Sequence, residues 1–164
     1  MDTKRGGTAA AAGVDIGRVL IEGDGADTSF LGASEEVAMR APEMRGGFEA
    51  VAALVEALAG RVWLVSKCGP RIEARTRRWL DERQFFSRTG MRRDHLRFCR
   101  ERREKVLIAE SLGLDRFVDD RADVLRPMRG RLDLLVLFGA REAEPGLVAA
   151  PDWQQALPVL LRGT

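Results

Sequence analysis

The sequence predicts a three-layer α/β sandwich around a mostly parallel sheet of roughly five strands. Two observations carry this prediction. Short apolar runs alternate along the whole chain with segments of helical periodicity, which is typical of a parallel sheet covered by helices. Runs such as Arg61–Ser66 (RVWLVS) are also nearly continuously apolar, as in strands buried on both faces. The length of 164 residues fits one domain.

The first third of the chain is expected to hold a strand, an insertion and a helix. Ala10–Asp15 reads as a short buried strand that ends on a carboxylate, and Val19–Ile21 either continues it or begins a flap. Gly23–Arg45 is acidic and weakly periodic, which indicates an insertion of irregular or short helical structure. Between Gly46-Gly47 and Gly60, apolar residues recur at helical spacing and predict the first long helix: Phe48, Val51, Ala52, Val55, Leu58 and Ala59.

Strands and helices continue to alternate after Arg61–Ser66. Pro70 opens the next helix, at a position where its missing N–H does no harm. Gln84–Met91 is expected to be a connector that contains two adjacent phenylalanines. The remaining elements are expected in this order: a strand over Leu96–Phe98, a helix over Arg100–Leu112, a strand over Asp115–Val118, a brief helix through Met128, a strand over Leu132–Phe138 and a final helix capped by Asp152.

Composition bounds the class of protein. Residues 1–9 resemble a loose tail, and residues 10–164 are expected to form a single domain with a small insertion at about 22–47. No stretch approaches the roughly 18 apolar residues of a membrane span, and the early alanine tract is too short for a signal peptide. Two cysteines that lie 31 positions apart favour neither a disulfide framework nor a zinc site. We therefore expect a cytoplasmic protein.

Charge is distributed unevenly along the chain. The net charge is +2, but residues 71–105 hold 13 Lys and Arg against 6 Asp and Glu, a net charge of +7. Such a segment can guide an anionic substrate or bind nucleic-acid phosphates. It can equally be a solvated helical face, and both interpretations stay open. The segment contains few aromatic residues, which does not support a base-stacking platform.

Reactive polar residues follow three of the predicted strands. Asp15-Ile16-Gly17 follows the first strand, Ser66-Lys67 the second and Asp119-Asp120 the fourth, while Lys105 stands near the start of the helix before that fourth strand. The carboxyl ends of parallel strands meet at one edge of a sheet, where such folds bind ligands. Carboxylate oxygens at this edge suit Mg²⁺. A carboxylate beside this cation can attack a phosphoryl group and form an aspartyl-phosphate.

The same residues also have simpler interpretations. The aspartates can cap the helix or loop that follows their strand, and Ser66 can do the same. Lys105 stands among arginines on a basic segment, and Lys67 is more readily a solvated lysine than a Schiff-base former. The single histidine, His95, and the two cysteines are expected to be structural.

Taken in order, these motifs resemble those of the haloacid dehalogenase (HAD) superfamily of hydrolases, which have a Rossmann-like three-layer fold. VDIGRVLI (Val14–Ile21) is similar to the first motif of the family, WLVSKCG (Trp63–Gly69) to the second and RFVDDRADVL (Arg116–Leu125) to the fourth. Lys105 stands where the third motif is expected. The resemblance covers roughly residues 10–140.

The resemblance implies a Mg²⁺-dependent phosphohydrolase of the phosphatase type. Asp15 would be the nucleophile, and Ser66, Lys67 and Lys105 would bind the phosphate. The metal would be held by Asp15, the main-chain carbonyl of Gly17, Asp119 and Asp120. The substrate would be a phosphorylated molecule.

One position departs from the usual first motif of the family. A second aspartate normally stands two residues after the nucleophile and transfers protons, and Gly17 occupies that position here. Glycine keeps the main-chain carbonyl but removes a proton-transfer group that typically contributes a factor of about 10²–10⁴. A catalytically weak or inactive binding or assembly module with the same fold is therefore an alternative to a phosphatase. A protein that binds nucleic acid through its basic segment is a second alternative.

The gaps between the motifs leave little room for a cap domain. Residues 22–47 and 69–104 span 26 and 36 residues, and the second gap is already used by a core helix and a connector. We expect no cap or a minimal one. An uncovered site suits a large substrate, or an oligomer in which a neighbouring subunit closes the site.

Overall fold

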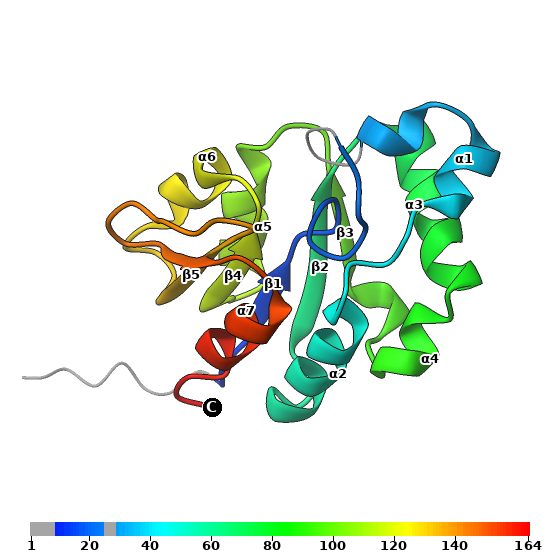
Figure 1. The fold of residues 1–164 in the computed structure, drawn as a ribbon. Coiled ribbons are helices and arrows are strands. Elements are labelled where there is room, and N and C mark those ends of the chain that lie inside the picture. Colours follow the sequence, from blue (N-terminus) through cyan, green and yellow to red (C-terminus); the bar gives the residue numbers. More distant parts are fainter. Residues whose placement is uncertain (1–8, 25–28) are drawn as a thin grey trace, which may run out of the picture.

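A computed structural model describes residues 9–24 and 29–164 of the chain. Its centre is a parallel sheet with the strand order β3-β2-β1-β4-β5-β6 (Figure 1). The expected tail over residues 1–9 lies, apart from residue 9, outside the described residues. The six strands are β1 (Ala12–Val14), β2 (Val62–Lys67), β3 (Leu96–Cys99), β4 (Arg116–Asp119), β5 (Leu134–Phe138) and β6 (Val148–Ala150).

Helices cover both faces of the sheet and complete three layers. One face packs against α2 (Gly47–Ala57), α3 (Pro70–Glu82), α4 (Phe85–Thr89) and α7 (Trp153–Leu160), whose buried side chains form one core cluster. The other face packs against α5 (Glu104–Ser111) and α6 (Ala122–Leu125), which build a second cluster. The remaining elements are α1 (Glu35–Arg40) and the 3₁₀ helices η1 (Ser29–Gly32), η2 (Arg93–His95) and η3 (Arg126–Met128).

The predicted fold class is confirmed, with a sixth strand in addition to the expected five. The sequence pattern did not predict β6, because this strand has only three residues, two of which are alanine, and alanine is depleted in strands. It lies at the edge of the sheet and pairs with β5 through Val136 and Val148. The expected connector at Gln84–Met91 is wrong in part, because Phe85–Thr89 is the helix α4.

Two sequence-based cap assignments are confirmed. Pro70 occupies the first turn of α3, and the carboxylate of Asp152 accepts a hydrogen bond from the amide of Gln155 at the start of α7. The helix expected over Arg100–Leu112 begins later, at Glu104. The side chain of Glu104 accepts hydrogen bonds from the amides of Arg100 and Glu101, so residues 100–103 form a turn before the helix.

Gly13 allows β1 to lie close to its neighbours at the centre of the sheet. A Cβ atom at this position would lie 2.4 Å from ring carbons of Phe117 and 2.8 Å from Leu114. Real Cβ contacts are longer than this, so a larger residue would push the strand away from the β4 side. The close approach matters for function, because β1 and β4 carry the carboxylates described below.

The insertion after β1 is attached to α3 and to the residue that directly follows it, Arg83. The indole Nε1 of Trp79 donates to the carbonyl of Ala41 at 2.8 Å. The guanidinium of Arg75 donates to the carbonyl of Leu31 at 2.7 Å, and Arg83 donates to the carbonyls of Met39 and Ala41. The described parts of the insertion are therefore held against the helical layer by hydrogen bonds to their backbone.

No helix among the described residues is long and apolar enough to cross a membrane.

Candidate active site

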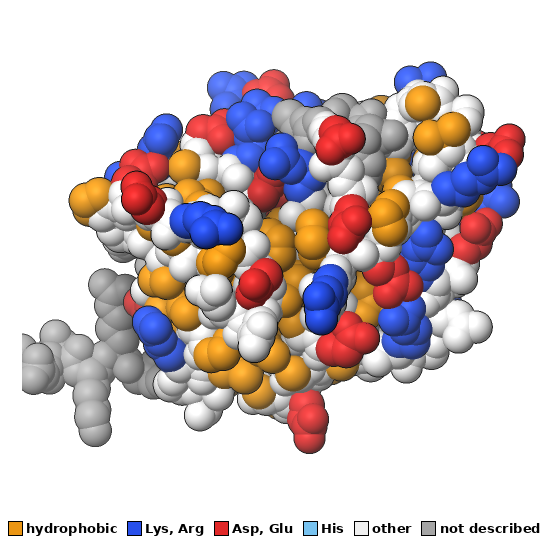
Figure 2. All heavy atoms as spheres, in the orientation of Figure 1, with side chains coloured by type: hydrophobic (Ala, Val, Ile, Leu, Met, Phe, Trp, Pro, Cys, Tyr) orange, Lys and Arg blue, Asp and Glu red, His pale blue; other side chains and the backbone are white. Residues whose placement is uncertain are grey.

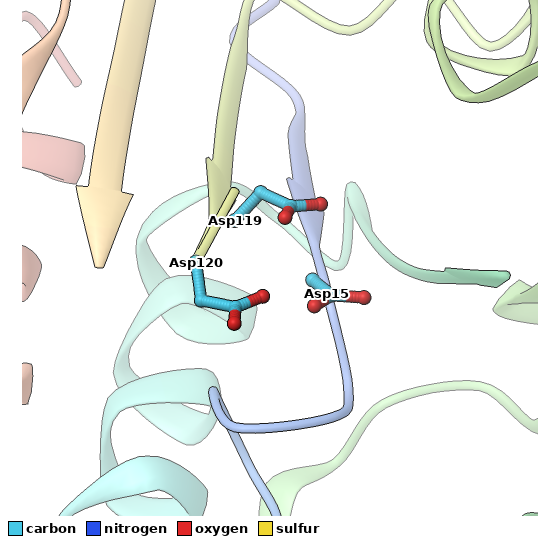
Figure 3. A group of neighbouring side chains, drawn as sticks. All are labelled: Asp15, Asp119 and Asp120. Atoms are coloured by element: carbon cyan, nitrogen blue, oxygen red, sulfur yellow. The ribbon is translucent and has the colours of Figure 1, made fainter. Parts of the chain in front are cut away.

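Three carboxylates meet at the carboxyl ends of β1 and β4 (Figure 3). Asp15 directly follows β1, Asp119 is the last residue of β4, and Asp120 follows it. The two strands are parallel neighbours with Val14 opposite Val118, which brings Asp15 next to Asp119. One oxygen from each carboxylate lies within 4.8 Å of the other two. The structure thus brings together the acidic residues that the sequence placed at separate strand ends.

Lys105 joins two of these carboxylates from the other layer of the fold. Its Nζ lies 2.8 Å from Oδ1 of Asp15 and 2.8 Å from Oδ2 of Asp119. The side chain of Lys105 is 2% exposed, so the ammonium group has left bulk water. A buried ammonium is stable only when its charge is compensated. The carboxylates supply this compensation, and Lys105 in turn fixes their orientation.

Burial and mutual repulsion shift the acidity of the cluster. Burial raises the pKa of Asp15 to about 6, against the opposing effect of the Lys105 ammonium. Burial and the charge of Asp15 raise the pKa of Asp119 to about 7. Burial and the charge of Asp119 raise the pKa of Asp120 to about 6. For Lys105, burial acts to lower the pKa, but the charges of Asp119 and Asp15 outweigh it and raise the pKa. Asp15 and Asp119 thus share the Lys105 cation, while Asp120 lies against Arg18.

Asp120 has an unsatisfied oxygen. Its Oδ1 is buried and has no hydrogen-bond partner within the described part of the chain, while Oδ2 lies 3.5 Å from Nε of Arg18. A buried acceptor without a partner is unfavourable unless another group completes the site. Three converging carboxylates with a spare oxygen match the ligands that Mg²⁺ prefers. The residues present therefore fit a divalent cation.

The loop after Asp15 is tightly folded. The carbonyl of Ile16 accepts hydrogen bonds from the amides of Val19, Leu20 and Ile21, and Gly17 forms a β-bridge with Ile21. Val19–Ile21 therefore does not continue the strand, and all three residues are fully buried. The alternative, that these residues begin a flap, stays a prediction. Gly17 is buried in this loop, two residues after Asp15. Its predicted role as a main-chain metal ligand stays a prediction.

Arg18 is a site residue that the sequence analysis missed. It adopts φ 62°, a conformation that non-glycine residues rarely take, and its guanidinium reaches Asp120. Local backbone strain of this kind is often found at functional sites. The only signal in the sequence was a cationic side chain three positions after Asp15, the expected nucleophile. No rule of residue spacing indicated that this side chain would contact Asp120.

Ser66 and Lys67 lie at the same edge of the sheet, on the strand next to β1. Ser66 is 1% exposed and Lys67 is half-buried. Adjacent residues of a strand point to opposite faces of the sheet, so the two side chains leave β2 in different directions. The hydrogen bonds that join Lys105 to Asp15 and Asp119 do not involve either residue. Their predicted role in phosphate binding stays a prediction.

The other reactive side chains have structural surroundings. Cys68 and Cys99 are buried and not in a disulfide, and burial raises the pKa of the Cys99 thiol to about 11. His95 stacks on Trp63 at a centroid distance of 4.2 Å, and its Nδ1 lies 2.9 Å from the carbonyl of Val62. These contacts match the structural roles expected for them, and they do not favour a thiol–imidazole pair.

Most arginines of the basic segment 71–105 form ion pairs with carboxylates, many of which belong to the segment itself. Arg77 and Arg100 both contact Glu73, and Arg88 contacts Glu43. Ion pairs with carboxylates involve eight of its arginines: Arg77, Arg78, Arg88, Arg92, Arg93, Arg100, Arg102 and Arg103. The contacts agree with a solvated helical face, which is the simpler of the two interpretations of this charge.

A known hydrolase structure resembles this fold over nearly its whole length. The crystal structure of a HAD-superfamily hydrolase of subfamily IA, variant 1, from Geobacter sulfurreducens PCA aligns with a TM-score of 0.59 and 14% identity. The alignment covers 96% of this chain and 99% of that chain. No family model matches the sequence, and no curated protein matches it significantly. The chain therefore has the fold of a HAD-superfamily hydrolase.

Proposed function

We propose that this protein is a Mg²⁺-dependent phosphohydrolase that acts through an aspartyl-phosphate on Asp15. The observation that carries the proposal is the buried cluster in which Lys105 holds Asp15 and Asp119 at 2.8 Å each. Buried charges with shifted pKa values at the carboxyl ends of parallel strands are typical of catalytic centres. The shared fold with a HAD-superfamily hydrolase supports the same reaction class.

In the first step, a carboxylate oxygen of Asp15 attacks the phosphorus of a phosphomonoester. The bond from phosphorus to the leaving oxygen breaks, and that oxygen keeps the electron pair and takes a proton from water. In the second step, water attacks the phosphorus of the acyl phosphate, the bond to Asp15 breaks, and inorganic phosphate is released. The Lys105 ammonium keeps Asp15 oriented throughout and supplies a positive charge near the phosphoryl oxygens.

Asp15, Asp119 and Asp120 would hold the metal, together with the main-chain carbonyl of Gly17 that the family resemblance implies. Mg²⁺ bound there supplies charge neutralisation for the phosphoryl group. We propose that Ser66 and Lys67 bind phosphoryl oxygens from the neighbouring strand. Gly17 offers no proton to the leaving group, so we expect faster turnover of esters whose leaving group is already a weak base.

Hydrolysis of 4-nitrophenyl phosphate by the purified protein tests this proposal, because its leaving group needs little protonation. We expect turnover that requires Mg²⁺ and stops in EDTA. Asp15→Asn should lower turnover by at least about 10³-fold. Asp133→Asn, which changes an exposed aspartate before β5, is the matched control and should leave turnover intact.

Turnover that survives in Asp15→Asn would reject Asp15 as the nucleophile. An absence of turnover with any phosphomonoester would instead support the second candidate, a binding or assembly module with the same fold. Gly17 is the observation that favours this candidate, because the usual proton-transfer group is absent. Nucleic-acid binding has less support, because acidic neighbours pair with most arginines of the basic segment.

A further inference from the structure

A groove runs along the carboxyl ends of β5 and β6. It consists of two adjoining cavities of about 500 and 400 Å³. Both cavities are lined by Met44, Phe138 and Pro151, so they form one continuous groove, which we call the β5–β6 groove. Phe138 is the last residue of β5, and Pro151 directly follows β6. Cavities of this size are typical of small-molecule sites.

The near end of the β5–β6 groove lies beside the carboxylate cluster. Arg18 lines this end, and its Nε lies 3.5 Å from Oδ2 of Asp120. The strand register leads to the same place: Asp119 is paired with Leu137, so Phe138 follows next to Asp120. When a phosphoryl group is bound at Asp15, the rest of the substrate would therefore be able to reach the groove.

The floor of the groove is apolar and well supported. Phe138 and Trp153 have ring centroids 5.3 Å apart, and the indole Nε1 of Trp153 donates to the carbonyl of Val19 at 2.7 Å. Met44 and Leu157 add further apolar surface. Figure 2 shows hydrophobic side chains at the centre of this face, flanked by acidic and basic ones. Phe138 and Trp153 are themselves 4% and 2% exposed, so the accessible apolar surface comes mainly from the half-buried Met44 and Leu157, and it favours an apolar group.

Among the described residues that line the groove, carboxylates outnumber cations. Glu22 and Asp24 line the near end, both are exposed, and neither forms an ion pair with a described residue. The Arg18 guanidinium at this end already contacts Asp120. Further along, the described lining residues include two carboxylates, Glu49 and Asp152, and one cation, Arg45. The charge pattern favours a positively charged ligand group over a negatively charged one.

We propose that the β5–β6 groove binds the leaving group of the substrate and selects one with an apolar body and a positively charged end. The substrate class is thus a phosphomonoester of an amine-bearing alcohol or phenol. This inference rests on the proposed phosphohydrolase function and adds its specificity. Glu22 and Asp24, which line the first of the two cavities, are the specificity-determining residues, so the positively charged group is expected to lie in that cavity, over Met44, Phe138 and Pro151.

Two phosphate esters with the same phenolic leaving oxygen test the proposal: O-phosphotyramine and the phosphate ester of 3-(4-hydroxyphenyl)propanoate. They differ in the charge at the far end of the side chain. We expect kcat/KM to be about tenfold higher for O-phosphotyramine, through attraction by two exposed carboxylates and repulsion of the anionic ester. The preference should shrink as KCl is raised, because salt screens exposed charges.

A double variant, Glu22→Gln with Asp24→Asn, should bring the ratio of the two kcat/KM values close to one. The matched control, Glu56→Gln with Asp133→Asn, removes the same net charge at exposed positions outside the groove and should keep the preference. Equal turnover of the two esters by the unmodified protein would overturn the inference and leave the phosphohydrolase function standing. A loss of preference in the control would also overturn it, because net charge would then be the cause.

A binding measurement distinguishes failure of the proposed phosphohydrolase function from failure of the inference about the groove. If neither these esters nor 4-nitrophenyl phosphate is hydrolysed, the phosphohydrolase proposal fails. Calorimetry with tyramine and with 3-(4-hydroxyphenyl)propanoate then examines the groove alone. Tighter binding of tyramine, weakened in the Glu22→Gln/Asp24→Asn variant, supports a cation-selective groove. Equal binding of the two molecules, or none, overturns it.

Discussion

Nζ of Lys105 lies 2.8 Å from Oδ1 of Asp15, although the two residues are 90 positions apart in the chain. The contact joins the helical layer to the central strand of the sheet, and Asp119 completes it from the neighbouring strand. Burial removes the water that would otherwise solvate these charges, so each charge depends on the others. Stability and the proposed chemistry therefore depend on the same three side chains.

Lys105→Met is expected to destabilise the protein by about 3–5 kcal/mol at pH 8, because two buried carboxylates lose their cation. The loss should be smaller at pH 5, below the pKa values of about 6 and 7 for Asp15 and Asp119, where both groups take up protons. Urea unfolding at the two pH values measures this. Arg141→Met, at an exposed position, is the control and should change stability by less than about 1 kcal/mol. An equal loss of unfolding free energy at both pH values would contradict the charge coupling between Lys105 and the two carboxylates.

Asp120→Asn should change the pH dependence of stability in EDTA. The pKa of Asp120 is raised to about 6, so the folded protein binds this proton more tightly than the unfolded chain does. Ionisation of Asp120 therefore costs stability as pH rises from about 4 to 7. The variant should gain about 1–2 kcal/mol relative to the unmodified protein over that range.

Thermal unfolding in EDTA and in MgCl₂ measures the effect of Asp120→Asn. With Mg²⁺ present, the unmodified protein should be the more stable of the two, because it binds the cation through its full set of carboxylates. A variant that Mg²⁺ stabilises as strongly as the unmodified protein would argue against Asp120 as a ligand.

Gly17→Asp should supply the proton donor that the first motif lacks. We expect turnover of an alkyl phosphate such as glycerol 2-phosphate to rise by about 10²-fold, because its leaving group needs protonation. Turnover of 4-nitrophenyl phosphate should change much less. The ratio of the two rates is the measurement, and each substrate serves as the control for the other. An equal change with both substrates would point to an altered site and not to acid catalysis.

Arg83→Leu tests how firmly the insertion is attached to the helical layer. Arg83 donates to the carbonyls of Met39 and Ala41 and stacks over Trp79 at 4.6 Å. Its loss should lower the unfolding free energy by about 1 kcal/mol, because two part-buried carbonyls lose a donor while the carbonyl of Ala41 keeps the one from Trp79. Cleavage by protease within residues 33–45 should become faster. Arg71→Leu, at an exposed position on the same helix α3, should affect neither measurement.

Local pattern predicted most of the framework. Apolar runs located β2 and β5, and the strands expected at Leu96–Phe98 and Asp115–Val118 are β3 and β4 to within a residue. Asp15 and Asp119-Asp120 were placed at strand ends, where the structure has them. Strand and helix periods, caps and strand-end polar residues depend on neighbours within a few positions, so a single sequence carries them.

Contacts between distant segments were decided only by the tertiary structure. The sequence indicated that Lys105 stands before the fourth strand, but not that its ammonium holds two carboxylates. It did not reveal the contact of Arg18 with Asp120, or the β5–β6 groove. Each depends on which strands are neighbours and on how layers pack, and these relations join residues that no local spacing connects. The sequence alone therefore determined which groups stand at the strand ends, and the packing of the layers decided which of them meet.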